Sequence, residues 1–161
     1  MEFLIVGLGN PGKDYEKTRH NIGHRIVEFF ANTCGMKFKQ NEKFQGLFAR
    51  GEIEGKTVNF LLPTTYMNLS GIATRLCQEY YKIDLAHLLI VVDDVETDIN
   101  KIIGTGIDIN QGTTSAVIIF KDRLPGDMNK SQLLDLKEFI DTNYAGQQNS
   151  QITINVSELA D

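Results

Sequence analysis

Four segments of this sequence carry side chains suited to hydrolytic chemistry, and each lies past a strand-like stretch, directly or after a loop. These segments are residues 7–12 with Asn10, residues 18–21 with His20, residues 63–71 with Asn68, and the pair Asp93-Asp94. An imidazole can act as a base near neutral pH, a carboxylate can orient it, and a carboxamide binds neutral polar groups. Open α/β sheets bind ligands beyond the carboxyl ends of their strands. We therefore expect these segments to form one site.

His20 is the candidate catalytic base. It follows a loop that begins at a strand end, and Asp93 ends a later apolar run that we expect at the same edge of a parallel sheet. An aspartate there can accept a hydrogen bond from one ring nitrogen, which leaves the other nitrogen free to take a proton from water. The alternative is that His20 is an ordinary polar surface residue.

The sequence offers no signature of a covalent nucleophile or a metal site. It lacks a Gly-x-Ser-x-Gly elbow, and Cys34 and Cys77 lie in helical patterns among apolar neighbours. His24 follows His20 by about one helical turn, but no His-Glu-x-x-His pattern is present. We therefore expect base-catalysed attack by water, without a covalent enzyme intermediate, a metal or an organic cofactor.

Residues 7–12 match the pattern G-x-G-x-x-G, which raises the alternative of a dinucleotide-binding protein. That alternative requires a helix directly after the loop and an acidic residue closing a second strand about 20 residues on. Here the helical pattern begins only near His20, and the candidate acid, Glu28, falls inside it. We interpret the glycines as allowing a sharp turn and a close approach to a ligand. Asn10 then lies at the mouth of the sheet, and Pro11 fixes the path of the loop.

Residues 66–68 have two interpretations. In the first, Asn68 caps the following helix while Tyr66 and Met67 pack. In the second, Tyr66 offers a stacking face, and Asn68 hydrogen-bonds a substrate carbonyl or a nucleotide edge. The length of the loop before Leu69 leaves both interpretations open.

Hydrophobic periodicity predicts the elements that must position these residues. Helices are expected from His20 or Asn21 to a stop at Gly35, over 69–80 with Ile72, Ala73 and Leu76 facing inward, and over 133–140. Strands are expected at 3–6, 44–53, 57–62, 88–92, 102–109 and 116–120, with a further edge strand suggested at 152–156. Glu54-Gly55-Lys56 predicts a hairpin. This alternation predicts an α/β fold, a single globular domain over residues 1–161 whose mixed twisted sheet is flanked by helices.

Composition narrows the class of protein. The chain has 161 residues, of which 42% are hydrophobic, and a net charge of −5. Residues 1–90 hold 11 Lys and Arg against 9 Asp and Glu, whereas residues 91–161 hold 5 against 12. A polyanion should therefore dock on the N-terminal half, near the basic residues Lys13, Lys17, Arg19, Lys37, Lys39 and Lys43. Without an apolar run of 18 residues or a signal-peptide pattern, and with two packing cysteines, we expect a cytoplasmic protein that does not span a membrane.

Three stretches together resemble the bacterial peptidyl-tRNA hydrolase family. They read LIVGLGNPGKDYEKTRHNIG, LLPTTYMNLSG and LLIVVDDVETD, and they follow the family's order and spacing over about residues 1–100. The resemblance implies an α/β globule with a mixed sheet between helices. It also implies hydrolysis of the ester that joins a peptide to the 3′ adenosine of tRNA, by a monomer that needs no cofactor and no metal.

The resemblance also implies roles for individual residues. His20 is the base that activates water, and Asp93 holds His20 in its basic form. Asn10 senses the blocked α-amino group of the substrate. Tyr15, Tyr66 and Asn68 line the site for the peptide and for the terminal nucleotides, so the expected partner is the acceptor end of peptidyl-tRNA.

The sequence departs from the family after Gly106. The family's glycine-rich loop with a His-Asn-Gly signature, and the helix after it, have no room in the 18 residues between Gly106 and Pro125. Asp108 and Asp122 add charges that repel phosphate, and whether Asn110 replaces the lost carboxamide stays open. Two alternatives therefore remain beside the hydrolase: a weakened or inactive relative that binds RNA or protein, and a hydrolase of small esters.

Overall fold

The computed structural model describes residues 2–9, 22–53, 55–65, 69–84, 87–93, 115–121, 138 and 151–155. For residues 22, 92, 93, 115–121 and 151–155 it describes the backbone alone. The elements are β1 (Glu2–Gly7), α1 (Ile22–Thr33), β2 (Lys39–Asn41), β3 (Gly46–Ile53), β4 (Lys56–Pro63), α2 (Ser70–Tyr80), β5 (Leu88–Asp93), β6 (Ser115–Lys121) and β7 (Gln151–Asn155).

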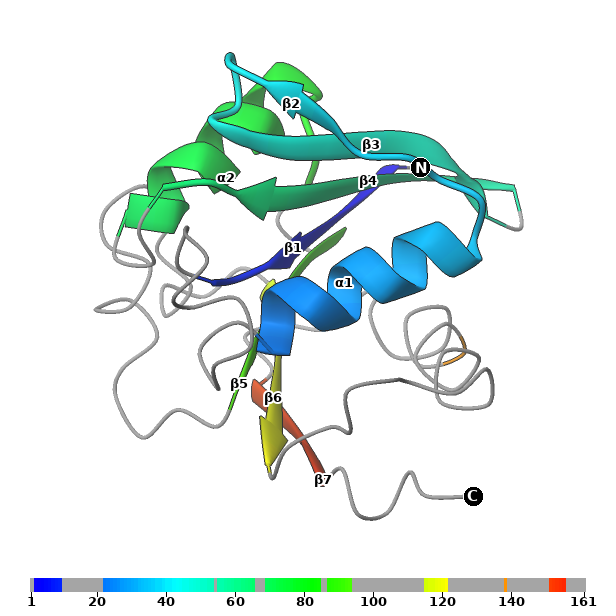
Figure 1. Cartoon of the computed structure of the whole chain (residues 1–161), viewed down its shortest axis with the longest axis vertical. Coiled ribbons are helices and arrows are strands. Elements are labelled where there is room, and N and C mark those ends of the chain that lie inside the picture. Colours follow the sequence, from blue (N-terminus) through cyan, green and yellow to red (C-terminus); the bar gives the residue numbers. More distant parts are fainter. Residues whose placement is uncertain are drawn as a thin grey trace.

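In the described part of the chain, seven strands form one mixed sheet with the order β2-β3-β4-β1-β5-β6-β7 (Figure 1). The pairs β2·β3 and β3·β4 are antiparallel, and the pairs β4·β1, β1·β5, β5·β6 and β6·β7 are parallel. The expected mixed α/β sheet is therefore confirmed, with β1 at its centre.

The two helices cover opposite faces of the sheet (Figure 1). Side chains alternate along a strand, and in β1 Phe3 and Ile5 pack with the residues of α1. Leu4 and Val6 face the other way and pack with Ala73 of α2. Strand β1 is therefore packed on both faces, between two layers of core.

The hairpin between β3 and β4 forms as predicted, but β3 starts later. Ile53 pairs with Lys56 in the ladder, and Gly55 takes the left-handed φ of 81° that the turn requires. The prediction began this strand at Phe44. Phe44 instead lies in a turn, because its N–H donates to the Asn41 side-chain oxygen at 3.1 Å.

Helix α1 ends at Thr33, and Gly35 follows with a φ of 81°, which confirms the predicted stop. The predicted inner face of α2 is confirmed for Ala73, which is fully buried in the core, and for Leu76, which is half-buried and packs against that core. Ile72 is half-buried and is not part of that core cluster. The face against the sheet is built mainly from small side chains, which let the helix come close to the strands. These buried residues are Ser70, Gly71, Ala73, Thr74 and Cys77.

The later strands agree with the periodicity where the structure describes them. Leu88–Val91 of β5 are fully buried, as expected for a central parallel strand. Strand β6 covers the predicted strand at 116–120, and β7 forms the sheet edge that residues 152–156 suggested. The strand expected at 102–109 lies outside the described residues, as does the helix at 133–140 except for Glu138, which is helical.

Candidate functional site

The carboxyl ends of three neighbouring parallel strands meet at one edge of the sheet. Val6 of β1 pairs with Leu61 of β4, and Gly7 pairs with Val91 of β5. The ends of these strands at Gly7, Pro63 and Asp93 therefore lie side by side. This confirms, for the backbone, the expectation that three of the four chemistry-bearing segments emerge at the same edge.

This edge is also where the chain changes direction within the sheet. After β1 the chain passes through α1 to β2, β3 and β4, which lie on one side of β1. After β4 it passes through α2, on the opposite face, to β5 on the other side of β1. Open α/β sheets place ligands at such a switch point, beyond the strand ends.

The main chain of Leu8 ties this edge to the start of α1. Its N–H donates to the Val91 carbonyl at 3.0 Å, and its carbonyl accepts from the N–H of His24 at 2.9 Å. One peptide segment therefore fixes the end of β1 to both β5 and α1. Asp93 follows Val91 by two residues, and His20 precedes His24 by four.

Gly7 is needed at the contact between β1 and α1. A Cβ at this position would lie 2.6 Å from the Gly23 carbonyl oxygen and 2.8 Å from Val27 Cβ. Both distances are shorter than real side chains adopt, so only glycine fits at this spacing. The first glycine of the G-x-G-x-x-G match thus has a packing role that requires no dinucleotide.

The connection after β4 is anchored at its first residue. Both the N–H and the hydroxyl of Thr64 donate to the Gln45 carbonyl, at 3.0 and 3.1 Å. The next hydroxyl, that of Thr65, is inaccessible to solvent and has no hydrogen-bond partner among the residues that the structure describes. The exposed Leu69 occupies the N-cap position of α2, so the interpretation that places Asn68 at the cap is not supported.

The predicted site residues themselves are covered only in part. Asp93 is described as the last backbone position of β5. Five other predicted residues lie outside the described part of the chain: Asn10, Tyr15, His20, Tyr66 and Asn68. Asp108, Asn110 and Asp122 also lie outside it. The roles given to these side chains stay predictions.

Within the described ranges, no group of three or more His, Cys, Asp or Glu side chains is placed to hold a metal ion. Neither helix in those ranges is long and apolar enough to cross a bilayer.

Cys77 is fully buried, and burial, together with the negative charge of Glu2, raises the pKa of its thiol to about 12. Cys77 is therefore a packing residue, as its apolar surroundings in the sequence indicated.

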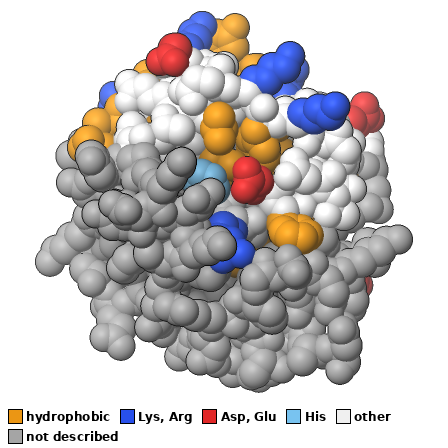
Figure 2. Space-filling model, viewed as in Figure 1, with side chains coloured by type: hydrophobic (Ala, Val, Ile, Leu, Met, Phe, Trp, Pro, Cys, Tyr) orange, Lys and Arg blue, Asp and Glu red, His pale blue; other side chains and the backbone are white. Residues whose placement is uncertain are grey.

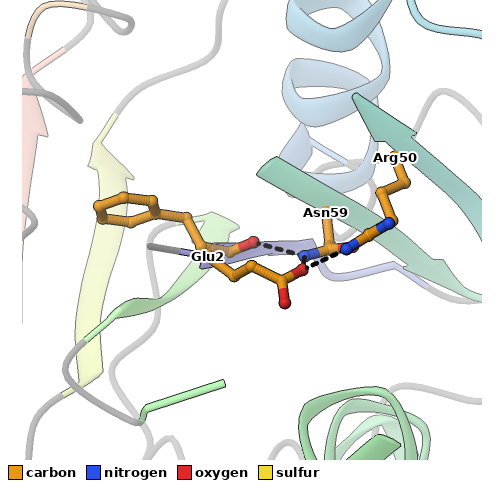
Figure 3. A network of polar contacts seen from close by, with 4 residues as sticks. Glu2, Arg50 and Asn59 are labelled. Atoms are coloured by element: carbon orange, nitrogen blue, oxygen red, sulfur yellow. Dashed lines mark hydrogen bonds and ion pairs between the residues drawn. The ribbon is translucent and has the colours of Figure 1, made fainter. Parts of the chain in front are cut away.

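A polar network that the sequence analysis missed crosses β1, β3 and β4 (Figure 3). Asn59, which is fully buried, donates to the Phe3 carbonyl at 3.0 Å and to the Glu2 carboxylate at 3.2 Å, and it accepts from Arg50 Nε at 3.0 Å. Arg50 also forms an ion pair with Glu2 at 2.8 Å. Burial alone raises the pKa of Glu2, but the hydrogen bonds from Arg50 and Asn59 outweigh it and lower that pKa. Glu2 begins β1, so the network lies away from the carboxyl edge.

Basic and aromatic side chains mix on the surface beside β3 and the end of α2. Lys43 Nζ lies 3.7 Å from the ring centroid of Tyr80, and the Arg50 guanidinium lies 4.6 Å from that of Tyr81. In the view of Figure 2, several basic side chains lie along the upper rim, with acidic ones between them. Of the six basic residues expected to meet a polyanion, Lys37, Lys39 and Lys43 are described, and all three are exposed.

These features define a mixed α/β protein whose candidate site lies beyond the carboxyl ends of β4, β1 and β5. The family model for peptidyl-tRNA hydrolase matches residues 4–106, and the chain belongs to that family. This confirms the resemblance drawn from the sequence motifs. The match ends at Gly106, where the sequence departs from the family pattern.

Related proteins agree with this assignment. The protein named peptidyl-tRNA hydrolase of Clostridium tetani is 46% identical over 100 residues, which cover 62% of this chain and 53% of that protein. The corresponding protein of Clostridium perfringens (strain SM101 / Type A) is 48% identical over 99 residues, 62% of this chain and 52% of its own length. This chain therefore spans about half the length of the curated relatives that it matches.

Structural similarity extends further along the chain. The crystal structure of peptidyl-tRNA hydrolase from Acinetobacter baumannii superposes with a TM-score of 0.61 at 32% identity. The superposition covers 89% of this chain and 75% of the Acinetobacter baumannii chain. The fold expected from the sequence is thus confirmed as that of this family.

Proposed function

We propose that this protein hydrolyses the ester bond of peptidyl-tRNA, releasing the peptide and free tRNA, with His20 as the base that activates water. The observation that carries the proposal is the pair of hydrogen bonds made by Leu8, because they join the chain near His20 to the chain near Asp93. Family membership supports the choice of substrate. We further propose that the chain acts as a metal-free monomer in the cytoplasm.

In the proposed reaction, His20 takes a proton from water while its other ring nitrogen donates to the Asp93 carboxylate. The water oxygen attacks the ester carbonyl, and the tetrahedral intermediate collapses with release of the 3′ oxygen of the terminal adenosine. Protonated His20 returns its proton to that oxygen. No covalent intermediate with the protein forms, and no redox step is needed.

The remaining predicted residues bind the substrate. Asn10 hydrogen-bonds the acylated α-amino group, which separates peptidyl-tRNA from ordinary aminoacyl-tRNA. Tyr15, Tyr66 and Asn68 line the site for the peptide and the terminal nucleotides. A carboxamide suits this purpose because it offers both a donor and an acceptor without a charge.

The test is deacylation of N-acetyl-aminoacyl-tRNA by the wild type, His20→Ala and His87→Ala. Loss of a general base lowers the rate by on the order of 100- to 10,000-fold. His87→Ala is the matched control, since His87 packs against Phe3 with ring centroids 4.7 Å apart, beside the amino end of β5. We expect His20→Ala to lose activity and His87→Ala to keep it. Equal rates for all three proteins would refute the assignment of His20. A salt-dependent complex with tRNA and no turnover would favour the RNA-binding alternative.

A further inference from the structure

The surface beside β3 and the end of α2 combines a cluster of aromatic rings with basic side chains. The rings of this cluster belong to Phe44, Phe48, Tyr80 and Tyr81, and the centroids of neighbouring rings lie between 4.8 and 5.8 Å apart. Phe44 is buried, whereas Tyr80 is 53% exposed, so the cluster reaches the solvent at Tyr80. We call this cluster and the three basic residues beside it the basic-aromatic surface; the basic residues are Lys39, Lys43 and Arg50.

Lys43 is held over the exposed ring of Tyr80. Its Nζ lies 3.7 Å from the ring centroid, where the ring attracts the cation. The side chain is exposed, and no carboxylate in the described part of the chain forms an ion pair with it. An ammonium group has three N–H donors, and the ring occupies only one side of it. Because the ring restrains a long side chain, a ligand meets a partly pre-organised amine at a lower entropic cost.

The other two basic residues of this surface differ in their pairing. Arg50 lies over Tyr81 at 4.6 Å and forms an ion pair with Glu2, which neutralises much of its charge. Lys39 lies opposite Phe48 in the ladder of β2 and β3, so its side chain leaves the sheet on the face that carries the cluster. Lys39 is exposed, and it too has no ion pair with a described carboxylate. The surface thus presents two lysines that no described carboxylate pairs with.

Exposed carboxylates adjoin these lysines in the sequence. Glu42 precedes Lys43, and Glu79 precedes Tyr80, and both glutamates are exposed. The surface is therefore not a broad positive field, and a partner must be recognised by single ammonium groups beside an exposed ring. RNA fits this description, because its phosphates accept hydrogen bonds one by one and nucleic-acid-binding surfaces combine such donors with aromatic side chains.

The basic-aromatic surface begins next to the candidate site. Lys43 lies in the turn before β3, and the carbonyl of Gln45 in the same turn accepts hydrogen bonds from the N–H and the hydroxyl of Thr64. Thr64 directly follows Pro63, which ends β4 at the carboxyl edge of the sheet. A tRNA whose acceptor end lies beyond that edge can therefore lay its stem along this surface.

The distribution of charge along the chain favours the same side of the molecule. Residues 91–161 hold 5 Lys and Arg against 12 Asp and Glu. The strands of this acidic half that the structure describes, β6 and β7, lie at the edge of the sheet opposite to β2 and β3 (Figure 1). Phosphates are repelled by the acidic half, so an RNA stem should lie toward β2 and β3.

We propose that the basic-aromatic surface binds the phosphate backbone of the tRNA stem. Lys39 and Lys43 donate hydrogen bonds to phosphate oxygens, and the ring of Tyr80 holds Lys43 in place. This inference rests on the proposed function for the identity of the RNA, and it adds a contact that lies apart from the ester. Because neither lysine acts on the ester, the loss of either should raise KM for N-acetyl-aminoacyl-tRNA and leave kcat unchanged.

Binding of deacylated tRNA, followed by fluorescence anisotropy from about 50 to 200 mM salt, tests this surface without any hydrolysis. We expect Lys43→Gln and Lys39→Gln each to weaken binding about 3- to 10-fold at low salt and to reduce the slope of log Kd against log salt by about 1, the share of one phosphate contact. Lys56→Gln is the matched control, because it removes the same charge. Its Nζ also lies over a ring, 5.6 Å from the Phe3 centroid, but at the amino ends of β1 and β4. Lys56→Gln should bind tRNA as the wild type does.

Two variants of Tyr80 test the role of its ring. In Tyr80→Leu, Lys43 keeps its charge but loses its restraint, so binding of tRNA should weaken about 2- to 5-fold while the salt dependence stays that of the wild type. Tyr80→Phe keeps the ring and should bind as the wild type does. Melting curves measured in parallel ensure that each variant is folded at the assay temperature. Wild-type affinity in a folded Tyr80→Leu would overturn the role given to this ring.

Hydrolysis of N-acetyl-aminoacyl-tRNA by the same proteins separates this inference from the proposed function. If the wild type hydrolyses this substrate while Lys39→Gln and Lys43→Gln match its affinity and salt dependence, the inference alone fails. If the wild type does not hydrolyse it, but Lys43→Gln binds tRNA more weakly than Lys56→Gln, hydrolysis fails and the inference stands. An equal loss of binding in Lys43→Gln and Lys56→Gln overturns the inference, because net charge alone would then explain the effect. A wild type that binds no tRNA overturns it as well.

Discussion

Replacing Gly7 by alanine should displace α1 and thereby separate the proposed base from its carboxylate. The new Cβ would lie 2.6 Å from the Gly23 carbonyl oxygen, whereas ordinary contact begins at 3.4 Å, so about 0.8 Å must be gained. Neither this oxygen nor Val27 Cβ, at 2.8 Å, can rotate away, because both are fixed to the helix. The helix itself must therefore move relative to β1.

This displacement should lower both the folding stability and the catalytic rate. Overpacking of this kind costs roughly 1–3 kcal/mol of folding free energy. A misplacement of about 1 Å in a catalytic group can lower a rate about 100-fold. Since His20 lies just before α1 and Asp93 lies on β5, we expect kcat to fall by more than the loss of stability explains, with little change in KM.

The assay measures kcat and KM for N-acetyl-aminoacyl-tRNA at a temperature well below the melting point, with urea denaturation in parallel. Gly51→Ala is the matched control, since its Cβ would meet only the flexible side chain of Met36, with its end, Cε, at 2.7 Å and with Sδ and Cγ at 3.0 and 3.3 Å. That flexible end can swing aside, so kcat should be unchanged. A Gly7→Ala protein that is destabilised but keeps the wild-type kcat would refute the idea that this contact positions the base.

Three further predictions concern stability and reactivity. Asn59→Ala removes the hydrogen bonds of the buried Asn59 side chain to the Phe3 carbonyl and to Arg50, and urea denaturation should show a loss of about 1–3 kcal/mol. Glu2→Gln tests the lowered pKa of Glu2, which lies below 4.5 in the folded protein. The wild type should therefore have a higher free energy of unfolding than Glu2→Gln above pH 4.5. This stability advantage should disappear as pH falls through the folded-state pKa. An advantage that does not shrink at all as pH falls below 4.5 would contradict this, because the lowered pKa requires the unfolded chain to take up its proton first. Cys77, with a pKa of about 12, should resist alkylation in the folded protein and react when urea unfolds it, which mass spectrometry can follow.

The sequence could predict the elements that depend on local pattern. The stop at Gly35 and the hairpin at Gly55 followed from residues that suit a positive φ. The start of β3 was misplaced because Phe44 is apolar and looked like part of the strand, although it belongs to a turn. The prediction of Ala73 and Leu76 on the inner face of α2 is confirmed, but it omits the small buried side chains, such as Ser70 and Thr74, that the sheet selects at the closest approach.

The sequence could predict which edge of the sheet carries the candidate site, but not the long-range contacts that build this edge. Three of the chemistry-bearing segments directly follow apolar runs, at Gly7, Pro63 and Asp93, so their shared edge follows from parallel pairing. The link through Leu8 depends on the register of β1 against β5 and on the depth at which α1 packs. The bond between Arg50 and Glu2 likewise joins residues 48 positions apart. Contacts of this range follow from the assembled sheet and not from any local pattern.

Strand β5, which ends at Asp93, is paired with a strand on each side. One of these two strands belongs to the altered C-terminal half, so this pairing matters for the proposed reaction. On one side β5 pairs with β1, with Val91 opposite Gly7, and on the other Asp93 itself pairs with Phe120 of β6. Strand β6 lies beyond the family match, which ends at residue 106, yet it completes the sheet beside β5. The divergent part of the chain therefore still pairs with the backbone at Asp93, and the resemblance implies that the family's His-Asn-Gly loop, for which this sequence has no room, is a substrate contact. Losing one such hydrogen-bond donor costs on the order of 100- to 1000-fold in rate. Hydrolysis by this chain should accordingly be slower than that of relatives with the loop, but it should keep its dependence on His20 and Asp93.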